Sequence, residues 1–261
     1  MSRRDALVAA AALAGVAGLT TVGPDALAAA QDKPAAPASQ SPSPAPVTLR
    51  YAFKPGEVSR YRSVTTISYP DDAVASETRK SEWTETVHAV APDGAFTLAT
   101  GAGDNLSLVT YDKNGRFVGQ TTGGKPADGV NLIFGVLNSR YVPDKPVTTG
   151  ETWRQEFDNP VVKDAKIPLV YTYLGSEKLL GRDTHKLKLT IAIDKPITAE
   201  TEVVRWLDAQ TGQTVKATRA LKGIPSLNGI SHRTTETVLV IPGVNDKEAP
   251  GEPTKDEKTK P

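Results

Sequence analysis

The chain has 261 residues, no cysteine and a formal net charge of +1 at pH 7. The lack of cysteine excludes disulfides, thiolate metal sites, cysteine nucleophiles and a lipid anchor attached through a cysteine. The charge is spread along the chain without a basic block, which argues against a nucleic-acid partner.

The N-terminal 30 residues have the pattern of an export signal peptide. Ser2-Arg3-Arg4 is basic, residues 6–19 are mildly apolar, and small residues favour cleavage after Ala28 or Ala30. The segment resembles the twin-arginine signal, which exports folded proteins, except that Ala6 stands where phenylalanine is usual. An ordinary secretory signal is the alternative. We therefore expect a periplasmic or secreted bacterial protein, with no stable membrane insertion once the signal is removed.

The remainder divides into three parts by composition. Residues 31–46 are rich in Pro, Ala and Ser and predict a disordered linker. Residues 245–261 alternate charged residues with Pro and Gly and predict a disordered charged tail. Residues 47–244 between them are long enough for one β-rich domain.

Alternation of apolar and polar residues is the main pattern in this domain. In Lys186–Ile193 every second residue is Leu or Ile, which indicates a strand with one buried face. Strands are also predicted at 48–54, 58–69, 81–91, 96–100, 106–111, 117–121, 169–174, 202–207, 214–220 and 233–241. Short turns between them favour hairpins. The predicted fold is all-β with one minor helix, a strongly curved antiparallel sheet or half-open barrel, with a β-sandwich as the alternative.

One segment has the period of a helix instead. Val130, Ile133, Phe134 and Leu137 recur at helical spacing, and Asp128 is placed to be the N-cap. We expect this helix to cover the concave side of the sheet with the four apolar residues turned inward. The space beneath is either a ligand pocket or is filled by those side chains.

Three motifs that suggest metal or phosphate binding have simpler explanations. Residues 119–125 match the start of a phosphate loop, but Pro126 stands where Ser or Thr would bind magnesium. Asp112-Lys113-Asn114-Gly115 favours a turn over a calcium loop. The histidines show no metal-ligand spacing, so no metal site and no cofactor are predicted.

Charged residues within apolar strand faces are the candidates for a binding site. Glu85 shares a strand side with Trp83, and Arg205 lies between Val203 and Leu207 on another. If these sides face a cavity, the charges anchor a ligand; otherwise the opposite faces are the buried ones. The predicted ligand-binding residues are Trp83, Glu85, Phe134, Arg205 and Trp206.

Turn and core residues along the domain carry a resemblance. Leu49-x-Tyr51-x-Phe53-x-x-Gly56-x-x-x-x-Tyr61, Pro92-Asp93-Gly94 and Val147-x-x-Gly150-x-x-Trp153 resemble a pattern of uncharacterised exported bacterial β-rich proteins. Their outline is similar to the periplasmic lipoprotein-carrier fold. That resemblance implies a curved antiparallel sheet; the carrier fold has several helices on its concave side, whereas this chain predicts one.

Two hypotheses about function follow. The first is an exported non-enzymatic binding or cell-envelope structural protein, whose partner is an apolar small molecule or an envelope component. The alternative is a hydrolase acting on envelope or extracellular polymers, with Glu85 and Glu202 as paired carboxylates. The sequence leaves the oligomeric state open.

Overall fold

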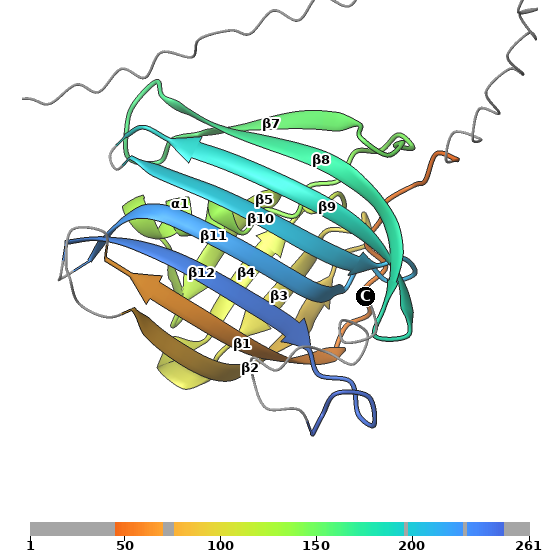
Figure 1. The fold of residues 1–261 in the computed structure, drawn as a ribbon. Helices are drawn as coiled ribbons and strands as arrows, with labels where there is room; N and C mark the ends of the chain where they lie inside the picture. The colour runs from red at the N-terminus through yellow and green to blue at the C-terminus, as the bar shows by residue number, and fades with distance from the viewer. Residues whose placement is uncertain (1–44, 70–75, 196–197, 227–228, 248–261) are drawn as a thin grey trace, which may run out of the picture. The chain divides into compact units, whose positions relative to one another are not determined.

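The computed structural model describes residues 45–69, 76–195, 198–226 and 229–247 of the chain. Within these residues, twelve antiparallel strands form one open sheet accompanied by a single short α-helix (Figure 1). The predicted fold class is therefore confirmed. The β-sandwich alternative is wrong, because all the strands belong to the same sheet.

Strands β3 to β7 are short, whereas β1, β2 and β8 to β12 are long. Their bounds are β1 Val58–Ser68, β2 Glu77–Val90, β3 Phe96–Thr100, β4 Ser107–Tyr111, β5 Phe117–Thr122, β6 Lys125–Pro126, β7 Thr152–Asp158, β8 Lys166–Leu179, β9 Arg182–Ile193, β10 Ala199–Asp208, β11 Thr214–Ser226 and β12 Gly229–Leu239. The helix α1 spans Gly129–Leu137, and a 3-10 turn, η1, spans Gly103–Asn105.

The sheet is a meander interrupted once. Its order is β6-β5-β4-β3-β2-β1-β12-β11-β10-β9-β8-β7, so β1 pairs with the last strand, β12, and the two halves of the chain join there. All other neighbours are consecutive in sequence. This order leaves β6 and β7 as the two edges of the sheet, with α1 between them in the chain.

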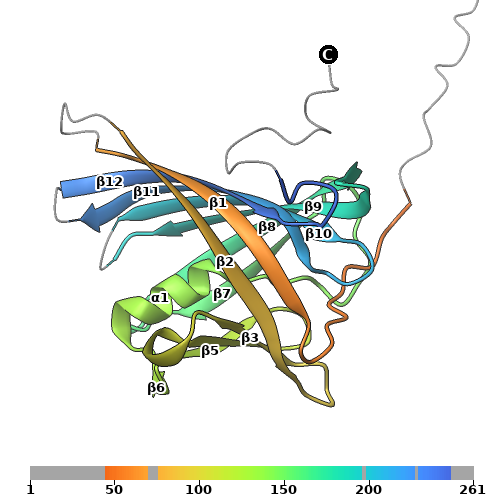
Figure 2. The same ribbon diagram turned by 90° about the horizontal axis from the view of Figure 1, so that it is seen from below.

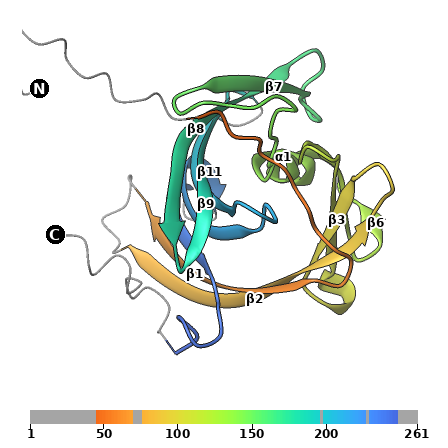
Figure 3. The same ribbon diagram turned by 90° about the vertical axis from the view of Figure 1, so that its right-hand side faces the viewer.

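The sheet curves strongly around a central space. Figure 3 shows α1 between β7 on one side and the β3–β6 half of the sheet on the other. Figure 2 shows the same helix beneath the long strands of the second half. Side chains connect the two sides: the Phe117 ring on β5 and the Phe157 ring on β7 lie 6.4 Å apart in an edge-to-face arrangement. The concave face is therefore the one that forms the core.

Alternation along the strands decides which side chains enter this core. In β9 the residues Leu187, Leu189, Ile191 and Ile193 are all buried, as predicted. The buried face of the helix is rotated relative to the predicted apolar stripe. Ile133 and Leu137 are buried, but Val136 joins them and Phe134 is 40% exposed.

The prediction that Phe134 turns inward is therefore wrong, and Gly135 supplies the physical reason. A Cβ atom built on Gly135 would lie 2.5 Å from the ring of Phe117. Because Gly135 has no side chain, the helix packs on β5 at this position. Phe134, one residue and about 100° around the helix, is turned toward solvent.

Two other segments differ from expectation. Residues 48–54 alternate like a strand, yet they form no strand of the sheet; Ala52 donates its N–H to the carbonyl of Thr211 in a loop. Strand β7 was not predicted, because its buried side consists of Trp153, Gln155 and Phe157, and the central glutamine breaks the apolar alternation.

The domain extends slightly beyond the predicted C-terminal boundary. Asn245, assigned to the charged tail, is buried and donates a hydrogen bond from its amide to the carbonyl of Leu239. The predicted signal peptide at 1–30, residues 31–44 of the predicted linker and residues 248–261 of the tail lie outside the described residues. No helix in the described part of the chain is long and apolar enough to cross a membrane.

Candidate functional site

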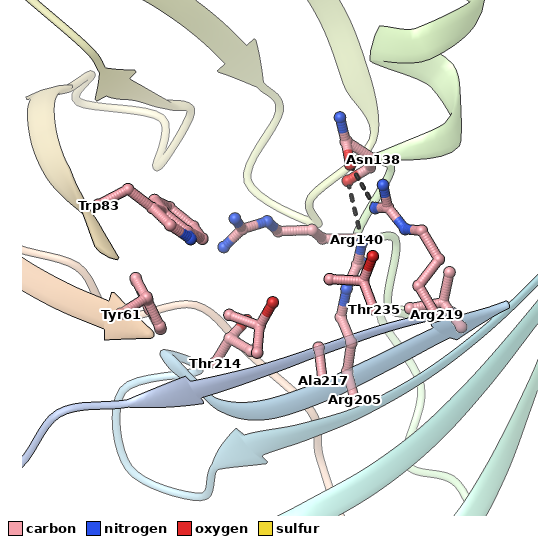
Figure 4. A pocket seen from close by; sticks show the side chains of 11 residues that line it. Tyr61, Trp83, Asn138, Arg140, Arg205, Thr214, Ala217, Arg219 and Thr235 are labelled. Carbon is pink, nitrogen blue, oxygen red and sulfur yellow. Dashed lines mark hydrogen bonds between the residues drawn. The ribbon is translucent and has the colours of Figure 1, made fainter. Parts of the chain in front are cut away.

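Two adjoining cavities lie on the concave face of the sheet. The larger, which we call the side cavity, has a volume of about 380 Å³ and is lined by Trp83, Glu85, Leu98, Thr100, Val109, Tyr111, Asn138 and Arg140. The other, which we call the basic cavity, has a volume of about 200 Å³ (Figure 4). It is lined by Tyr61, Trp83, Asn138, Arg140, Val203, Arg205, Thr214, Ala217, Arg219, Thr235 and Thr237. Trp83, Asn138 and Arg140 belong to both.

An aromatic pair forms one wall of the basic cavity. Tyr61 on β1 and Trp83 on β2 are direct cross-strand partners, and their rings stack with centroids 4.6 Å apart. The indole N–H of Trp83 donates to the hydroxyl of Ser63 at 3.0 Å, and that hydroxyl lies 2.9 Å from the hydroxyl of Thr237. These bonds fix the indole ring in place beside the cavity.

A β-bulge sets which residues of β11 face the cavity. The pairing of β10 with β11 shifts between Trp206 and Leu207, which pairs with Thr214. Beyond the bulge, Ala217 pairs with Arg205 and Arg219 pairs with Val203. Directly opposite residues in an antiparallel pair point to the same face, so Arg205 and Arg219 both enter the concave side.

Residues 138–142, which follow α1, cross the concave side and complete the cavities. Hydrogen bonds hold this segment from the β4–β5 turn: Arg140 N–H donates to the carbonyl of Gly115 at 3.0 Å, and Val142 N–H to that of Asn114 at 2.8 Å. The Asp112 carboxylate accepts the N–H groups of Asn114 and Arg116, which confirms the predicted turn.

Gly115 is required in that turn for two reasons. Its φ is +77°, which favours glycine, and a Cβ there would lie 2.8 Å from the carbonyl oxygen of Arg140. On the opposite side, the Tyr171 hydroxyl donates to the Ser139 hydroxyl at 3.0 Å. The segment is therefore held from both halves of the sheet.

Arg140 places a guanidinium between the two cavities, where it meets Glu85. Its Nη2 lies 2.6 Å from Oε2 of the carboxylate, and the side chains are 12% and 8% exposed. Burial alone lowers the pKa of Arg140, but the Glu85 charge and the nearby tyrosines outweigh it, so the pKa is raised. The Arg140 guanidinium is therefore held in its charged form beside Glu85.

Arg205 and Arg219 have only neutral partners among the described residues. Arg205 donates to the carbonyl of Ser139 at 2.7 Å and to that of Asn138 at 3.4 Å, while Arg219 donates to the amide oxygen of Asn138 (Figure 4). Burial, and then the charge of Arg140, lower the pKa of Arg205. Burial, and then the charge of Arg205, lower the pKa of Arg219 to about 10.

Three of the predicted ligand-binding residues line the cavities and two do not. Trp83, Glu85 and Arg205 come together at the concave face, as expected if those strand sides face a cavity. Phe134 lines neither cavity and is partly exposed. The prediction that Trp206 binds the ligand is also wrong, and the reason is the geometry of its strand.

Trp206 follows Arg205 directly in β10, and successive side chains of a strand point to opposite faces. Its indole N–H donates to the carboxylate of Glu177, and the ammonium groups of Lys186 and Lys216 lie 4.7 and 5.6 Å from its ring. Trp206 therefore belongs to a charged cluster on the convex face.

Sequence reasoning missed most of the lining of the basic cavity, including its polar and aromatic residues Tyr61, Asn138, Arg140 and Arg219. A signal existed for Arg219, which alternates with Ala217 and Leu221 on one side of β11. Arg140 and Asn138 lie outside any strand or helix, so no periodicity marks them. Only the fold brings them to the cavities.

The described residues hold no group of three or more His, Asp or Glu side chains positioned for a metal ion. The Nδ1 atom of His185 lies 3.0 Å from the Ser176 hydroxyl and 3.2 Å from that of Tyr173. Burial lowers its pKa, with Asp208 opposing.

Searches of protein-family models, curated proteins and solved structures found no match to this chain.

Proposed function

We propose that this protein is an exported, non-catalytic binding protein that holds a small ligand in the two cavities of its concave face. The observation that supports this best is the lining itself. A stacked aromatic wall, Tyr61 and Trp83, lies beside partly buried arginines within one concave space. Apolar walls with a few fixed polar groups are the usual composition of small-molecule sites.

The alternative of a hydrolase with paired Glu85 and Glu202 receives no support from the geometry. Glu85 faces the concave side and is occupied by Arg140. Glu202 is exposed, adjoins the inward-facing Val203, and pairs with Lys188 at 3.0 Å. The two carboxylates therefore lie on opposite faces of the sheet and cannot act on one bond.

Fluorescence of a neutral apolar probe tests the binding function. The full chain should bind N-phenylnaphthylamine saturably with a stoichiometry of one. Trp83→Ala should weaken this binding several-fold, because it removes one wall of both cavities. Trp206→Ala is the matched control, since Trp206 lies on the other face. Absence of saturable binding by the folded wild type, or equal losses in the two variants, would refute the proposal.

Export is the second part of the proposal and rests on Arg3-Arg4, the apolar residues 6–19 and the alanine-rich segment after them. Mass spectrometry of protein recovered outside the cytoplasm should find a chain beginning at Ala29 or Gln31. Replacing Arg3 and Arg4 with lysine should stop export by the twin-arginine route, whereas ordinary secretion would continue. Recovery of an intact N-terminus there would contradict removal of a signal peptide.

A further inference from the structure

The charges that line the two cavities do not balance. Their described lining holds three guanidinium groups, those of Arg140, Arg205 and Arg219, but Glu85 is its only carboxylate. Glu85 is committed to Arg140 through contacts of 2.6 and 3.4 Å. Among the described residues, neither Arg205 nor Arg219 has a carboxylate within 4.0 Å.

The neutral partners of these two arginines leave their charges uncompensated. Carbonyl and amide oxygens accept hydrogen bonds but supply only partial negative charge, and desolvating an unbalanced cation is costly. A guanidinium also has five N–H donors in a planar fork, and Arg219 uses one of its terminal nitrogens on Asn138. The lowered pKa values of both arginines agree with a site that disfavours their charge unless an anion binds beside them.

We infer that the ligand carries an oxyanion group, a carboxylate, sulfonate or phosphate, which Arg205 and Arg219 bind in the basic cavity. This inference rests on the proposed function and adds the chemical class of the ligand. Oxyanions match the guanidinium fork, and the hydroxyls of Thr235 and Thr237 lie in the same lining. The apolar part of the ligand contacts Trp83 and extends toward the side cavity, where Leu98 and Val109 provide an apolar wall.

The carboxylate of Glu85 sets the orientation of such a ligand. It lines the side cavity and neutralises Arg140, so a second negative charge is repelled there. The basic cavity holds the two arginines without a carboxylate. An amphipathic anion therefore binds with its charged group toward β10 and β11 and its apolar part toward β3 and β4.

Two probes with the same rings test this inference. Anilinonaphthalenesulfonate carries a sulfonate that N-phenylnaphthylamine lacks. The full chain should bind the sulfonate probe at least about tenfold more tightly than the neutral probe. This is the gain in affinity expected from one charge-assisted hydrogen bond. Arg219→Gln should weaken binding of the sulfonate probe far more than binding of the neutral probe, and so remove most of this preference. Arg219→Lys, which keeps the charge, should retain part of it.

Arg154→Gln is the matched control, because Arg154 is 61% exposed on β7 and lines neither cavity. Circular dichroism and thermal unfolding of each variant separate lost binding from lost folding; if Arg219→Gln does not fold, the comparison of wild type with Arg219→Lys decides. Octanoate and octyl phosphate should displace the sulfonate probe, whereas octanol should not. The anion that displaces the probe at the lower concentration shows whether a carboxylate or a phosphate is preferred.

The outcomes separate the two proposals. Equal affinity for both probes, unchanged in Arg219→Gln, overturns the oxyanion inference and leaves the binding function standing. Binding of neither probe overturns the proposed function, and the inference with it. Loss of the sulfonate preference in Arg154→Gln to the same extent as in Arg219→Gln assigns it to general surface charge and also overturns the inference.

Discussion

The Glu85–Arg140 pair is the interaction whose loss has the clearest cost. Both side chains are almost fully buried between the cavities, so removing one charge leaves the other desolvated and unpaired. Glu85→Gln should lower the free energy of unfolding by about 3 kcal/mol in urea titrations. Its control is Glu82→Gln on the same strand. Glu82 pairs with Arg60, both largely exposed, and its loss should cost less than about 1 kcal/mol.

A double variant tests the mechanism of that cost. Glu85→Gln combined with Arg140→Met removes both charges, so it should be more stable than Glu85→Gln alone. If Glu85→Gln and the control Glu82→Gln are equally stable, the unpaired buried charge has no special cost and the assignment of a buried charge pair fails.

At the level of single residues, the sequence predicted charges on apolar strand sides but not what they meet. Glu85 and Arg205 were recognisable because a charge interrupts an otherwise apolar alternation. Their partners were not: Arg140 and the carbonyls of residues 138 and 139 come from an irregular segment after the helix. Naming both Arg205 and Trp206 contradicted the strand period, since neighbours face opposite sides.

The helix α1 depends on close approach to strand β5. Alanine normally stabilises a helix relative to glycine by about 1 kcal/mol. At Gly135, however, an added Cβ would lie 2.5 and 2.6 Å from ring atoms of Phe117, itself buried. Gly135→Ala should therefore destabilise the protein by about 2 kcal/mol, measured by urea or thermal unfolding.

The matched control is Asn131→Ala in the same helix, where the side chain is exposed. This variant should be neutral or slightly stabilising, because alanine has the higher helix propensity. A stabilising Gly135→Ala would show that α1 does not pack on Phe117 in solution. The exposure of Phe134 would then need another cause than the close contact at Gly135.

Elements with regular alternation were predictable, and those shaped by distant contacts were not. β3 matches its predicted range of 96–100, because the alternation ends at clear turns on both sides. The segment at 48–54 alternates too, since Tyr51 and Phe53 pack against the core, but it finds no ladder partner. Alternation reports which side chains are buried, whereas strand formation also needs a neighbouring backbone.

Over the whole molecule, the concave space gathers aromatic side chains from distant parts of the chain. Tyr51, Tyr61, Tyr111 and Tyr171 come from the N-terminal segment and from β1, β4 and β8. Burial raises the pKa of each, with nearby charges as smaller contributions. An unfolded chain would ionise them at about pH 10, so the folded state binds these protons more tightly.

The protein should therefore lose stability in alkali. A phenol whose pKa is raised by folding contributes fully below its unfolded pKa, and this contribution falls as pH rises above it. From roughly pH 10 to 11 each of the four tyrosines should cost about 1 kcal/mol. Arg219 and Arg205 act oppositely, because their pKa values are lowered, to about 10 for Arg219, and the cost of their desolvated charges is relieved as they deprotonate, but they are two groups against four. Urea titrations across this range measure the sum.

Tyr61→Phe isolates one of these contributions. It removes a titrating hydroxyl and keeps the ring stacked on Trp83, so the variant should lose about 1 kcal/mol less than wild type from roughly pH 10 to 11. Tyrosinate absorbance provides an independent measure, since the four buried phenols should ionise only as the protein unfolds. If all seven tyrosines ionise near pH 10 while the fold persists, the concave face is open to water and its phenols are not desolvated. The cavities would then lack the low-dielectric walls on which the charges of Arg205 and Arg219 depend.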